Sequence, residues 1–288
     1  MKTEICVGKT SIDVDVPYAN TASDRIKISY TDRALDSFVV EPHRLSIKNG
    51  RVAGNELSVD RQGFQLVEWP SKVVHERLDE LIEENRAPSE VMGAVNLAYL
   101  AELEPLMLEM SGAREVIAQY GTVTVRFSKR ATARSWMTTA QFAHLDFAKS
   151  DIDRLLQQTL EITGREVLPY SRYVMMQAWR VLTPPPQDMP LAICDGRSVG
   201  LEDMIPLEFS GPKGSRNELV HSRACRFNPR HEWYFFPNMS VDEVIIFKGF
   251  DSDSPDAMNA MHTAIDDTTV VEAVPRGSVE CRFIALYD

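Results

Sequence analysis

A histidine and a carboxylate two positions apart are the first residues here with the types and spacing for metal chemistry. His144 and Asp146 stand in the stretch "TTAQFAHLDFAKSD", residues 138–151. Side chains i and i+2 of a strand point to the same side, about 7 Å apart along it. If "QFAHLDF" is a strand, both side chains face one way. A His-x-Asp pair is common, however, so its meaning depends on partners elsewhere in the chain.

A second histidine would complete a known set of metal ligands. Two imidazoles and one carboxylate on one face of the metal, with the other positions open, are the ligands of non-haem Fe(II) oxygenases. His262, in "AMHTAIDD", lies between the strand-like run "EVIIFKGF" and the last strand-like run of the chain. The other histidines stand ahead of the β-rich region, in a polar loop or at a strand edge: His43, His75, His221 and His231. His262 is therefore the preferred third ligand.

The residues after His262 point to a cosubstrate with a carboxylate. Arg276 follows fourteen positions later, and Ser278 stands two positions beyond it in "PRGSVECRF". On a strand these two side chains share a face, so both can reach one carboxylate. An Arg guanidinium binds a carboxylate through two hydrogen bonds and stays charged when it is desolvated. This arrangement favours a 2-oxoglutarate-dependent oxygenase, with Arg282, which has the same strand parity, as the alternative anchor.

These residues have to be positioned by a chain whose helices lie mostly near its start. Residues 1–70 contain short extended runs, with Asn49-Gly50 as a predicted hairpin turn. The spacing of apolar residues predicts a helix over 71–85 and a second helix that runs towards Pro105. The first part of the chain is therefore expected to be a mixed α/β layer.

The rest of the chain has mostly the pattern of strands. Alternating and β-branched runs recur from Val116 to the end, interrupted by one predicted helix over 150–162. The sequence thus predicts a mainly β fold with flanking helices: a double-stranded β-helix (a jelly-roll, cupin-like core) with an N-terminal α/β support layer. We expect a single oxygenase domain over 1–288, with N-terminal strands and supporting helices in 1–112 and the jelly-roll core in 113–288.

Composition and charge exclude some partners. The chain has 288 residues, 44% of them hydrophobic and 25% charged, and a net charge of -11. A nucleic-acid groove or an anionic membrane surface is therefore not expected as a partner. The most hydrophobic window contains three glutamates, which excludes a bilayer span. The spacing of the four cysteines fits neither a zinc ribbon nor a dense disulfide framework: Cys6, Cys194, Cys225 and Cys281. We expect a cytoplasmic protein with a small-molecule substrate; the sequence does not indicate its oligomeric state.

An ordered set of segments resembles a known family. The segments are "GNELSVDRQGFQLVEWPSKV", "SGAREV", "AHLDFAKSD", "QAWRVL", "PLAICDGRSV", "EWYFFPNMSVDEVIIFKGFDS", "HTAIDD" and "PRGSVECRFIALY". They resemble the asaB-type hydroxylase/desaturase family, which is related to gibberellin desaturases and CmcJ-like proteins. The resemblance runs from about residue 55 to the end. It implies a double-stranded β-helix, one Fe(II), and 2-oxoglutarate and O2 as cosubstrates, and it favours a secondary metabolite or an amino-acid-like acid as the substrate.

The resemblance also assigns roles to individual residues. It implies that His144, Asp146 and His262 are the catalytic metal ligands, and that Arg276 and Ser278 hold the distal carboxylate of 2-oxoglutarate. The family usually has Asn-x-Trp-Arg-Pro where this chain has "QAWRV". The amide of Gln177 is therefore expected to replace that of the family's Asn at the cosubstrate.

The residues that contact the substrate are less well marked. Candidates are Arg126, Phe142, Trp179 and Arg197. Hydroxylation, desaturation and oxidative ring closure all begin by removing a hydrogen atom from the substrate, and the sequence does not separate them. Two other hypotheses stay open. One is a cupin-like metalloenzyme that does not use 2-oxoglutarate, and the other is a non-catalytic jelly roll that binds a small molecule.

Overall fold

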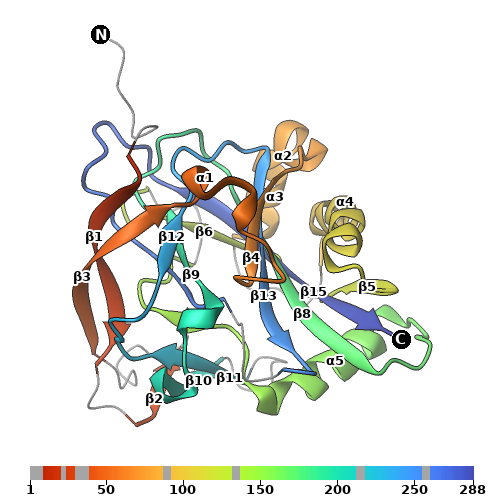
Figure 1. Ribbon diagram of the computed structural model, residues 1–288. Coiled ribbons are helices and arrows are strands. Elements are labelled where there is room, and N and C mark those ends of the chain that lie inside the picture. Colours follow the sequence, from red (N-terminus) through yellow and green to blue (C-terminus); the bar gives the residue numbers. More distant parts are fainter. Residues whose placement is uncertain are drawn as a thin grey trace.

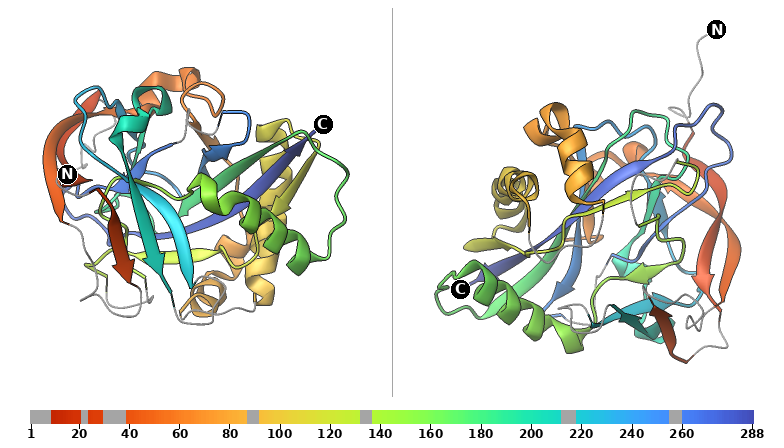
Figure 2. Two further views of the ribbon diagram at one scale, coloured as in Figure 1. Left: turned by 90° about the horizontal axis from the view of Figure 1, so that it is seen from below. Right: turned by 180° about the vertical axis from the view of Figure 1, so that it is seen from behind.

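Two β-sheets that pack face to face make up most of the protein. The computed structural model describes residues 9–20, 24–29, 39–86, 92–131, 137–211, 218–254 and 260–288. The core between the sheets contains Phe64, Trp179 and Phe247 from one sheet and Ile193 and Tyr234 from the other. Figures 1 and 2 show β1 and β3 at one side of the molecule and helix α4 at the other.

Among the described residues, nine strands form the larger sheet. In spatial order they are β1 (Ser11–Ala19), β3 (Val40–Asn49), β12 (Trp233–Phe235), β9 (Leu191–Cys194), β14 (His262–Ala264), β7 (His144–Leu145), β11 (Leu219–Cys225), β10 (Met204–Ser210) and β2 (Ile26–Ser29). The sheet curls, because β1 also lies against β11. An apolar cluster that includes Val16, Leu145 and Trp233 fills this curl.

In the described part of the chain, the second sheet has six strands. Their order is β4 (Phe64–Glu68), β13 (Glu243–Asp251), β8 (Arg172–Val181), β15 (Gly277–Tyr287) and β5 (Glu115–Ala118), with β6 (Thr124–Phe127) also paired to β15. The pairing of β8 with β15 is antiparallel and continuous over ten residue pairs, from Ser278 opposite Val181 to Tyr287 opposite Arg172. This register decides which side chains of the two strands meet.

The helices are α1 (Gly50–Ala53), α2 (Lys72–Glu76), α3 (Leu78–Glu84), α4 (Ala94–Ser111) and α5 (Lys149–Thr163), with short 3-10 turns η2 (Gly54–Glu56), η3 (Gly196–Ser198) and η4 (Leu201–Asp203). Helix α5 packs against Ile284 and Leu286 of β15. Helices α2, α3 and α4 cover the opposite, outer face of the second sheet. Figure 1 shows α2, α3 and α4 on the side of this sheet away from β1 and β3. Val279, Cys281 and Phe283 of β15 pack in the cluster that these helices complete. The neighbouring positions of β15 therefore face the interior between the sheets.

The predicted fold class is confirmed, since the protein is mainly β with a helical layer contributed by the N-terminal part. The described residues contain no helix with the length and apolar character that a bilayer span requires. The described cysteines are buried free thiols: Cys194, Cys225 and Cys281. Cys6 lies outside the described residues.

Several local predictions were wrong, each for a physical reason. Asn49 does not form a hairpin turn; its side chain accepts a hydrogen bond from Arg51 N and caps helix α1. The helix predicted over 71–85 is divided at Arg77 into α2 and α3. Helix α4 continues through Pro105 to Ser111. The expected strand "QFAHLDF" is paired only at His144–Leu145, so Asp146 lies at the bend that follows.

Candidate metal centre

The three predicted metal ligands converge at the centre of the curled sheet. His144 is in β7 and His262 is in β14, and the two residues are directly opposite each other in the antiparallel pairing of these strands. Their ring centroids are 4.4 Å apart. Asp146 follows β7 at a bend, which turns its carboxylate back towards both rings. One ligand atom from each residue lies within 4.8 Å of the others.

The orientation of both imidazoles suits metal binding. His144 Nδ1 is 2.8 Å from the carbonyl oxygen of Phe142, and His262 Nδ1 is 3.1 Å from that of Ala260. A carbonyl can only accept a hydrogen bond, so each Nδ1 carries the proton and each Nε2 offers a lone pair. His262 Nε2 is 3.3 Å from Asp146 Oδ2, and His144 Nε2 is 3.8 Å from Asp146 Oδ1. The nitrogens that can bind a metal therefore face the carboxylate.

Burial and charge set the protonation of the three ligands. Burial, together with the nearby His262, lowers the pKa of His144 to about 3, so this ring is neutral at physiological pH. Burial would raise the pKa of the Asp146 carboxyl, but the Arg282 guanidinium and His262 outweigh it and hold that pKa well below its usual range. Burial also opposes protonation of His262, yet the Asp146 carboxylate prevails and raises its pKa. The site thus offers a neutral imidazole and an ionised carboxylate, with a second imidazole held against the carboxylate.

This donor set fits a divalent iron ion. Two imidazole nitrogens and one carboxylate oxygen on one side of a buried point are the set that leaves the opposite side of the metal open. The exposed fractions of the side chains are 8% for His144, 13% for Asp146 and 5% for His262. Such a site is largely shielded from water, and Asp146 remains the most accessible of the three ligands.

Asp146 is surrounded by polar side chains from the second sheet. Gln177 Nε2 donates a hydrogen bond to Asp146 Oδ2, and Arg282 Nη2 lies 3.1 Å from Asp146 Oδ1. The same two nitrogens contact Glu280 Oε1, at 3.3 Å from Gln177 and 3.1 Å from Arg282. The amide of Gln177 is thus directed at the metal carboxylate. Arg282, the alternative cosubstrate anchor, contacts Asp146 directly.

Arg276 is buried with unused hydrogen-bonding capacity. It immediately precedes β15, and the residue is 2% exposed. Nη1 donates to the carbonyl oxygen of Met189, while Nε has no hydrogen-bond partner among the described residues. The guanidinium carbon lies 5.2 Å from the centre of the Trp179 ring. Burial lowers the pKa of Arg276 to about 9. The nearby carboxylates therefore do not fully compensate the positive charge of this guanidinium.

The backbone of Arg276 is held in place by a buried carboxylate. Its N–H donates to Asp188 Oδ1 at 2.8 Å, and Asp188 Oδ2 accepts from the hydroxyl of Ser128 at 2.6 Å. Ser278 is buried in β15, opposite Arg126 of β6. The structure therefore brings Arg276, Ser278 and Arg126 to one end of the interior face.

The predicted substrate contacts lie in different places. Arg126 is half-buried; it lies opposite Ser278 in the pairing of β6 with β15, and its Nη1 donates to the carbonyl oxygen of Thr138 at 3.0 Å. The ring of Phe142 is 4.8 Å from that of His144. Trp179 is buried beneath Arg276. Arg197 is not brought to the centre: it is half exposed and ion-pairs with its neighbour Asp195 at 2.6 Å.

Sequence reasoning did not identify Glu280 or Asp188 as parts of the site. Glu280 had a signal, because it stands between Ser278 and Arg282 at the same strand parity in an otherwise apolar strand. Asp188 had none, since it lies outside the named strands, after the Pro-rich turn. A buried acidic residue at the interior parity of a strand is the feature that points to a functional network.

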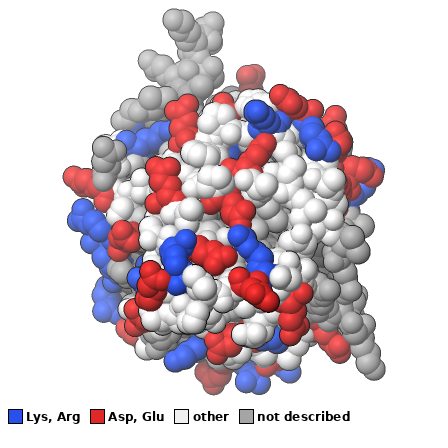
Figure 3. All heavy atoms as spheres, turned by 90° about the vertical axis from the view of Figure 1, so that its right-hand side faces the viewer, with Lys and Arg blue, Asp and Glu red and all other residues white. Residues whose placement is uncertain are grey.

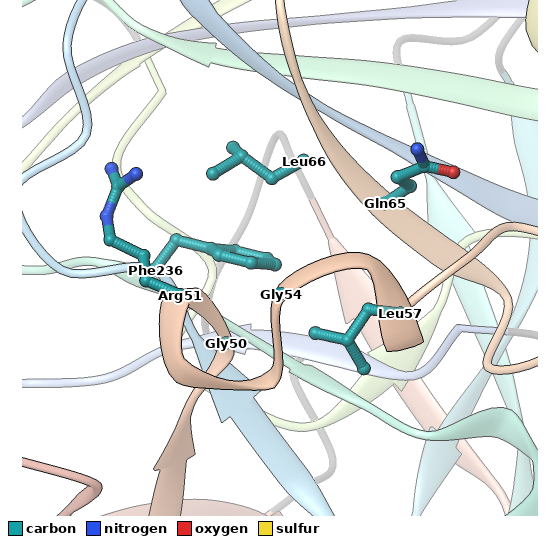
Figure 4. A pocket seen from close by; sticks show the side chains of 7 residues that line it. All are labelled: Gly50, Arg51, Gly54, Leu57, Gln65, Leu66 and Phe236. Atoms are coloured by element: carbon teal, nitrogen blue, oxygen red, sulfur yellow. The ribbon is translucent and has the colours of Figure 1, made fainter.

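Two surface hollows lie apart from these residues. One, of about 230 Å³, is lined by Gly50, Arg51, Gly54, Leu57, Gln65, Leu66 and Phe236 (Figure 4). The other, of about 440 Å³, has Arg197 in its lining. Neither lining includes a residue of the metal centre, and we assign the site from its ligand chemistry. The face that carries α4 and the C-terminus shows acidic and basic side chains intermixed (Figure 3).

Comparisons with known proteins agree with this chemistry. A family model described as "Oxidoreductase/YMDC permease-like domain" matches residues 14–286. The Fe(II)/2-oxoglutarate-dependent dioxygenase nvfI of Aspergillus novofumigatus is 25% identical over 244 residues, which cover 84% of this chain and 82% of that protein. The hydroxylase/desaturase efuI of Hormonema carpetanum is 28% identical over 253 residues, covering 81% and 80%. The predicted resemblance to hydroxylase/desaturase proteins is therefore confirmed.

A solved structure shows the same fold. A tryptophan-to-phenylalanine variant of the iron and alpha-ketoglutarate-dependent endoperoxidase NvfI superimposes with a TM-score of 0.78 at 21% identity. The alignment covers 97% of this chain and 98% of that one. This match confirms the predicted jelly-roll core. The relatives and the structural neighbour are iron- and 2-oxoglutarate-dependent enzymes or hydroxylase/desaturase proteins, as their names state.

Proposed function

We propose that this chain, which belongs to the oxidoreductase/YMDC permease-like family, is a non-haem Fe(II)- and 2-oxoglutarate-dependent oxygenase that acts on a small molecule. The observation that carries the proposal is the convergence of His144, Asp146 and His262, each imidazole turned by a backbone carbonyl so that Nε2 faces the carboxylate. In such enzymes, iron together with 2-oxoglutarate and O2 supplies the oxidising power to remove a hydrogen atom from a substrate.

The roles of this chain's own residues follow from their positions. His144, Asp146 and His262 would hold the iron. Gln177 and Arg282 bind the two oxygens of Asp146 and would keep that carboxylate oriented. Burial of the three ligands would exclude water from the reacting atoms.

Arg276 is our proposed anchor for the distal carboxylate of 2-oxoglutarate, with Ser278 beside it. Support comes from the buried guanidinium of Arg276, whose Nε has no partner among the described residues. This guanidinium stands over Trp179 and donates from Nη1 to the carbonyl oxygen of Met189, while the backbone N–H of Arg276 donates to Asp188. A carboxylate would satisfy that nitrogen and the uncompensated charge together. Arg282 is less suited to this role because it already pairs with Asp146 and Glu280.

Arg126 and Phe142 are the proposed substrate contacts. Arg126, opposite Ser278, would pair with an acidic group of the substrate, and Phe142, beside His144, would provide apolar contact. The reaction would be hydroxylation, desaturation or oxidative cyclisation.

We further propose one oxygenase domain over 1–288, supported by strands β1 and β3 lying in the same sheet as β7 and β14. We also propose a cytoplasmic location, supported by the free thiols of the described cysteines. The net charge of -11 supports the absence of a nucleic-acid or anionic-membrane partner.

Anaerobic addition of Fe(II) and 2-oxoglutarate tests the proposal. The folded protein should develop the visible charge-transfer absorption of an iron–2-oxoglutarate chelate, and the His144→Ala variant should not. Absence of the band from the folded wild-type protein would overturn the proposal. Iron binding without a band, and without succinate in a substrate screen, would instead indicate a metalloenzyme that does not use 2-oxoglutarate.

A further inference from the structure

Glu280 is a partly buried carboxylate beside the metal centre, and the proposed function gives it no role. It lies on β15 opposite Trp179 of β8, on the face that also carries Ser278 and Arg282. Its side chain is only 12% exposed. A carboxylate in such a position loses much of its hydration, so its partners have to compensate it.

The partners of Glu280 are also those of Asp146. Gln177 Nε2 donates to both carboxylates, at 3.3 Å to Glu280 Oε1. Arg282 Nη2 lies 3.1 Å from Asp146 Oδ1 and 3.1 Å from Glu280 Oε1. One amide and one guanidinium thus bridge the metal carboxylate and Glu280. The amide has two protons to donate, so holding Glu280 with one leaves the other for Asp146.

The charges in this network bear directly on the binding of a dication. A guanidinium 3.1 Å from Asp146 competes with a metal ion for that carboxylate and repels the ion. Asp146, Glu280 and Arg282 together carry two negative charges and one positive charge. Without Glu280 they would sum to zero, and the centre would lose the excess of negative charge that attracts a cation.

We propose that Glu280 is a positioning residue that neutralises Arg282 and thereby sets the affinity of the His144–Asp146–His262 centre for a divalent metal ion. This inference rests on the metal centre of the proposed function. It assigns to Glu280 no contact with metal or substrate; Glu280 acts through Arg282 and Gln177. Metal affinity in the absence of 2-oxoglutarate is therefore the quantity that it controls.

Titration with Mn²⁺ alone, with free Mn²⁺ measured by its EPR signal, tests the proposal. We compare the wild-type protein with Glu280→Gln, Arg282→Gln and the double variant. Glu280→Gln should weaken Mn²⁺ binding by about 10- to 100-fold, which is the usual range when a residue that orients a metal ligand is replaced. The double variant restores one net negative charge and should return to within about threefold of wild type, because the two effects are coupled. Arg282→Gln alone should bind Mn²⁺ at least as tightly as wild type.

Each result decides the matter. Unchanged affinity in Glu280→Gln would overturn the proposal, and so would a double variant as weak as Glu280→Gln. If Glu280→Gln does not fold, Arg282→Gln still decides, because weaker binding in that variant contradicts charge competition. Failure of the wild-type protein to bind Mn²⁺ would instead contradict the metal centre itself, which distinguishes the two failures.

A matched control removes another partly buried, arginine-paired carboxylate. Glu243, at the start of β13, accepts from Arg51 at 2.7 and 2.8 Å, and its side chain is 17% exposed. Phe247, whose ring packs on His262, is four residues further along β13. Glu243 is therefore roughly 13 Å along the strand from Phe247. Glu243→Gln should lower stability without changing Mn²⁺ affinity. An equal loss of affinity in both variants would show a general effect of destabilisation and would overturn the role of Glu280.

Discussion

Two buried clusters of this protein combine histidine with aspartate, yet their imidazoles are used differently. In the first, His231 Nδ1 is 2.9 Å from the hydroxyl of Tyr18, and Nε2 is 3.2 Å from Asp203 Oδ2. The hydroxyl of Tyr18 also accepts from Trp233 Nε1 at 2.6 Å. Both nitrogens of His231 are therefore occupied by side chains, and the cluster links β1 to the segments around β12.

In the metal centre, each imidazole uses only Nδ1 to fix its orientation. The acceptors are backbone carbonyls, and both Nε2 atoms point at one carboxylate. The comparison teaches that burial and an adjacent aspartate do not identify a ligand. A metal-binding histidine is identified by an imidazole that is oriented through one ring nitrogen, while its second ring nitrogen lies close to the ligand atoms of other residues.

The largest difference between the clusters should appear in metal binding. Replacing His144 with Ala removes one of three protein ligands, and we expect Mn²⁺ affinity to fall by more than about 100-fold. Titration followed by EPR measures it. A His144→Ala variant that retains wild-type affinity would contradict the assigned centre.

The same substitution at His231 should act on stability instead. His231→Ala leaves the Tyr18 hydroxyl and the Asp203 carboxylate short of a buried partner, so the free energy of unfolding should fall by about 3 kcal/mol. Urea denaturation measures this loss. Mn²⁺ affinity should stay as in the wild-type protein, and a joint loss of both would show that the clusters are coupled.

Arg276 offers a comparison of two buried arginines on opposite faces of the second sheet. Replacing it with Gln should raise the KM for 2-oxoglutarate by about 30- to 100-fold and leave Mn²⁺ affinity unchanged, because a charge-assisted pair is lost. Arg180 is the control: it faces the helices and donates to the carbonyls of Val241 and Trp69 at 2.7 and 2.6 Å. Arg180→Gln should reduce stability without a change in KM. A higher KM for 2-oxoglutarate in Arg180→Gln but not in Arg276→Gln would contradict the assignment of Arg276 as the cosubstrate anchor.

The smallest effect is a pH dependence from His231. Burial lowers the pKa of His231 despite the opposing effect of Asp203. The unfolded chain therefore takes up the proton more readily, so the contribution of this residue is complete above about pH 6.5 and decreases as the pH falls. When the pH falls from about 7.5 to about 5.5, the free energy of unfolding of the wild-type protein should decrease by up to about 1 kcal/mol more than that of the His231→Asn variant. Parallel stability curves for the two proteins would contradict this expectation.

Much of the site could be predicted because its features are local. The two-residue spacings of His144 with Asp146 and of Arg276 with Ser278 are readable from strand parity. Arg180 lies on the face opposite Gln177, as the alternation of side chains along a strand requires. Asn49-Gly50 failed because the Asn side chain caps a helix here, and local preference does not choose between these two uses of Asn. The position of Arg197, half exposed and paired with Asp195, depends on the path of a loop, which strand alternation does not predict.

The sequence by itself determined the ligand types, their order, the alternation of β8 and β15, and the apolar positions that pack under the helices. Only the tertiary structure decided that His144 stands opposite His262 and that Gln177 and Arg282 join Asp146 to Glu280. The physical reason is that side-chain alternation is a property of one strand. Register between strands distant in sequence is decided by the packing of the whole barrel.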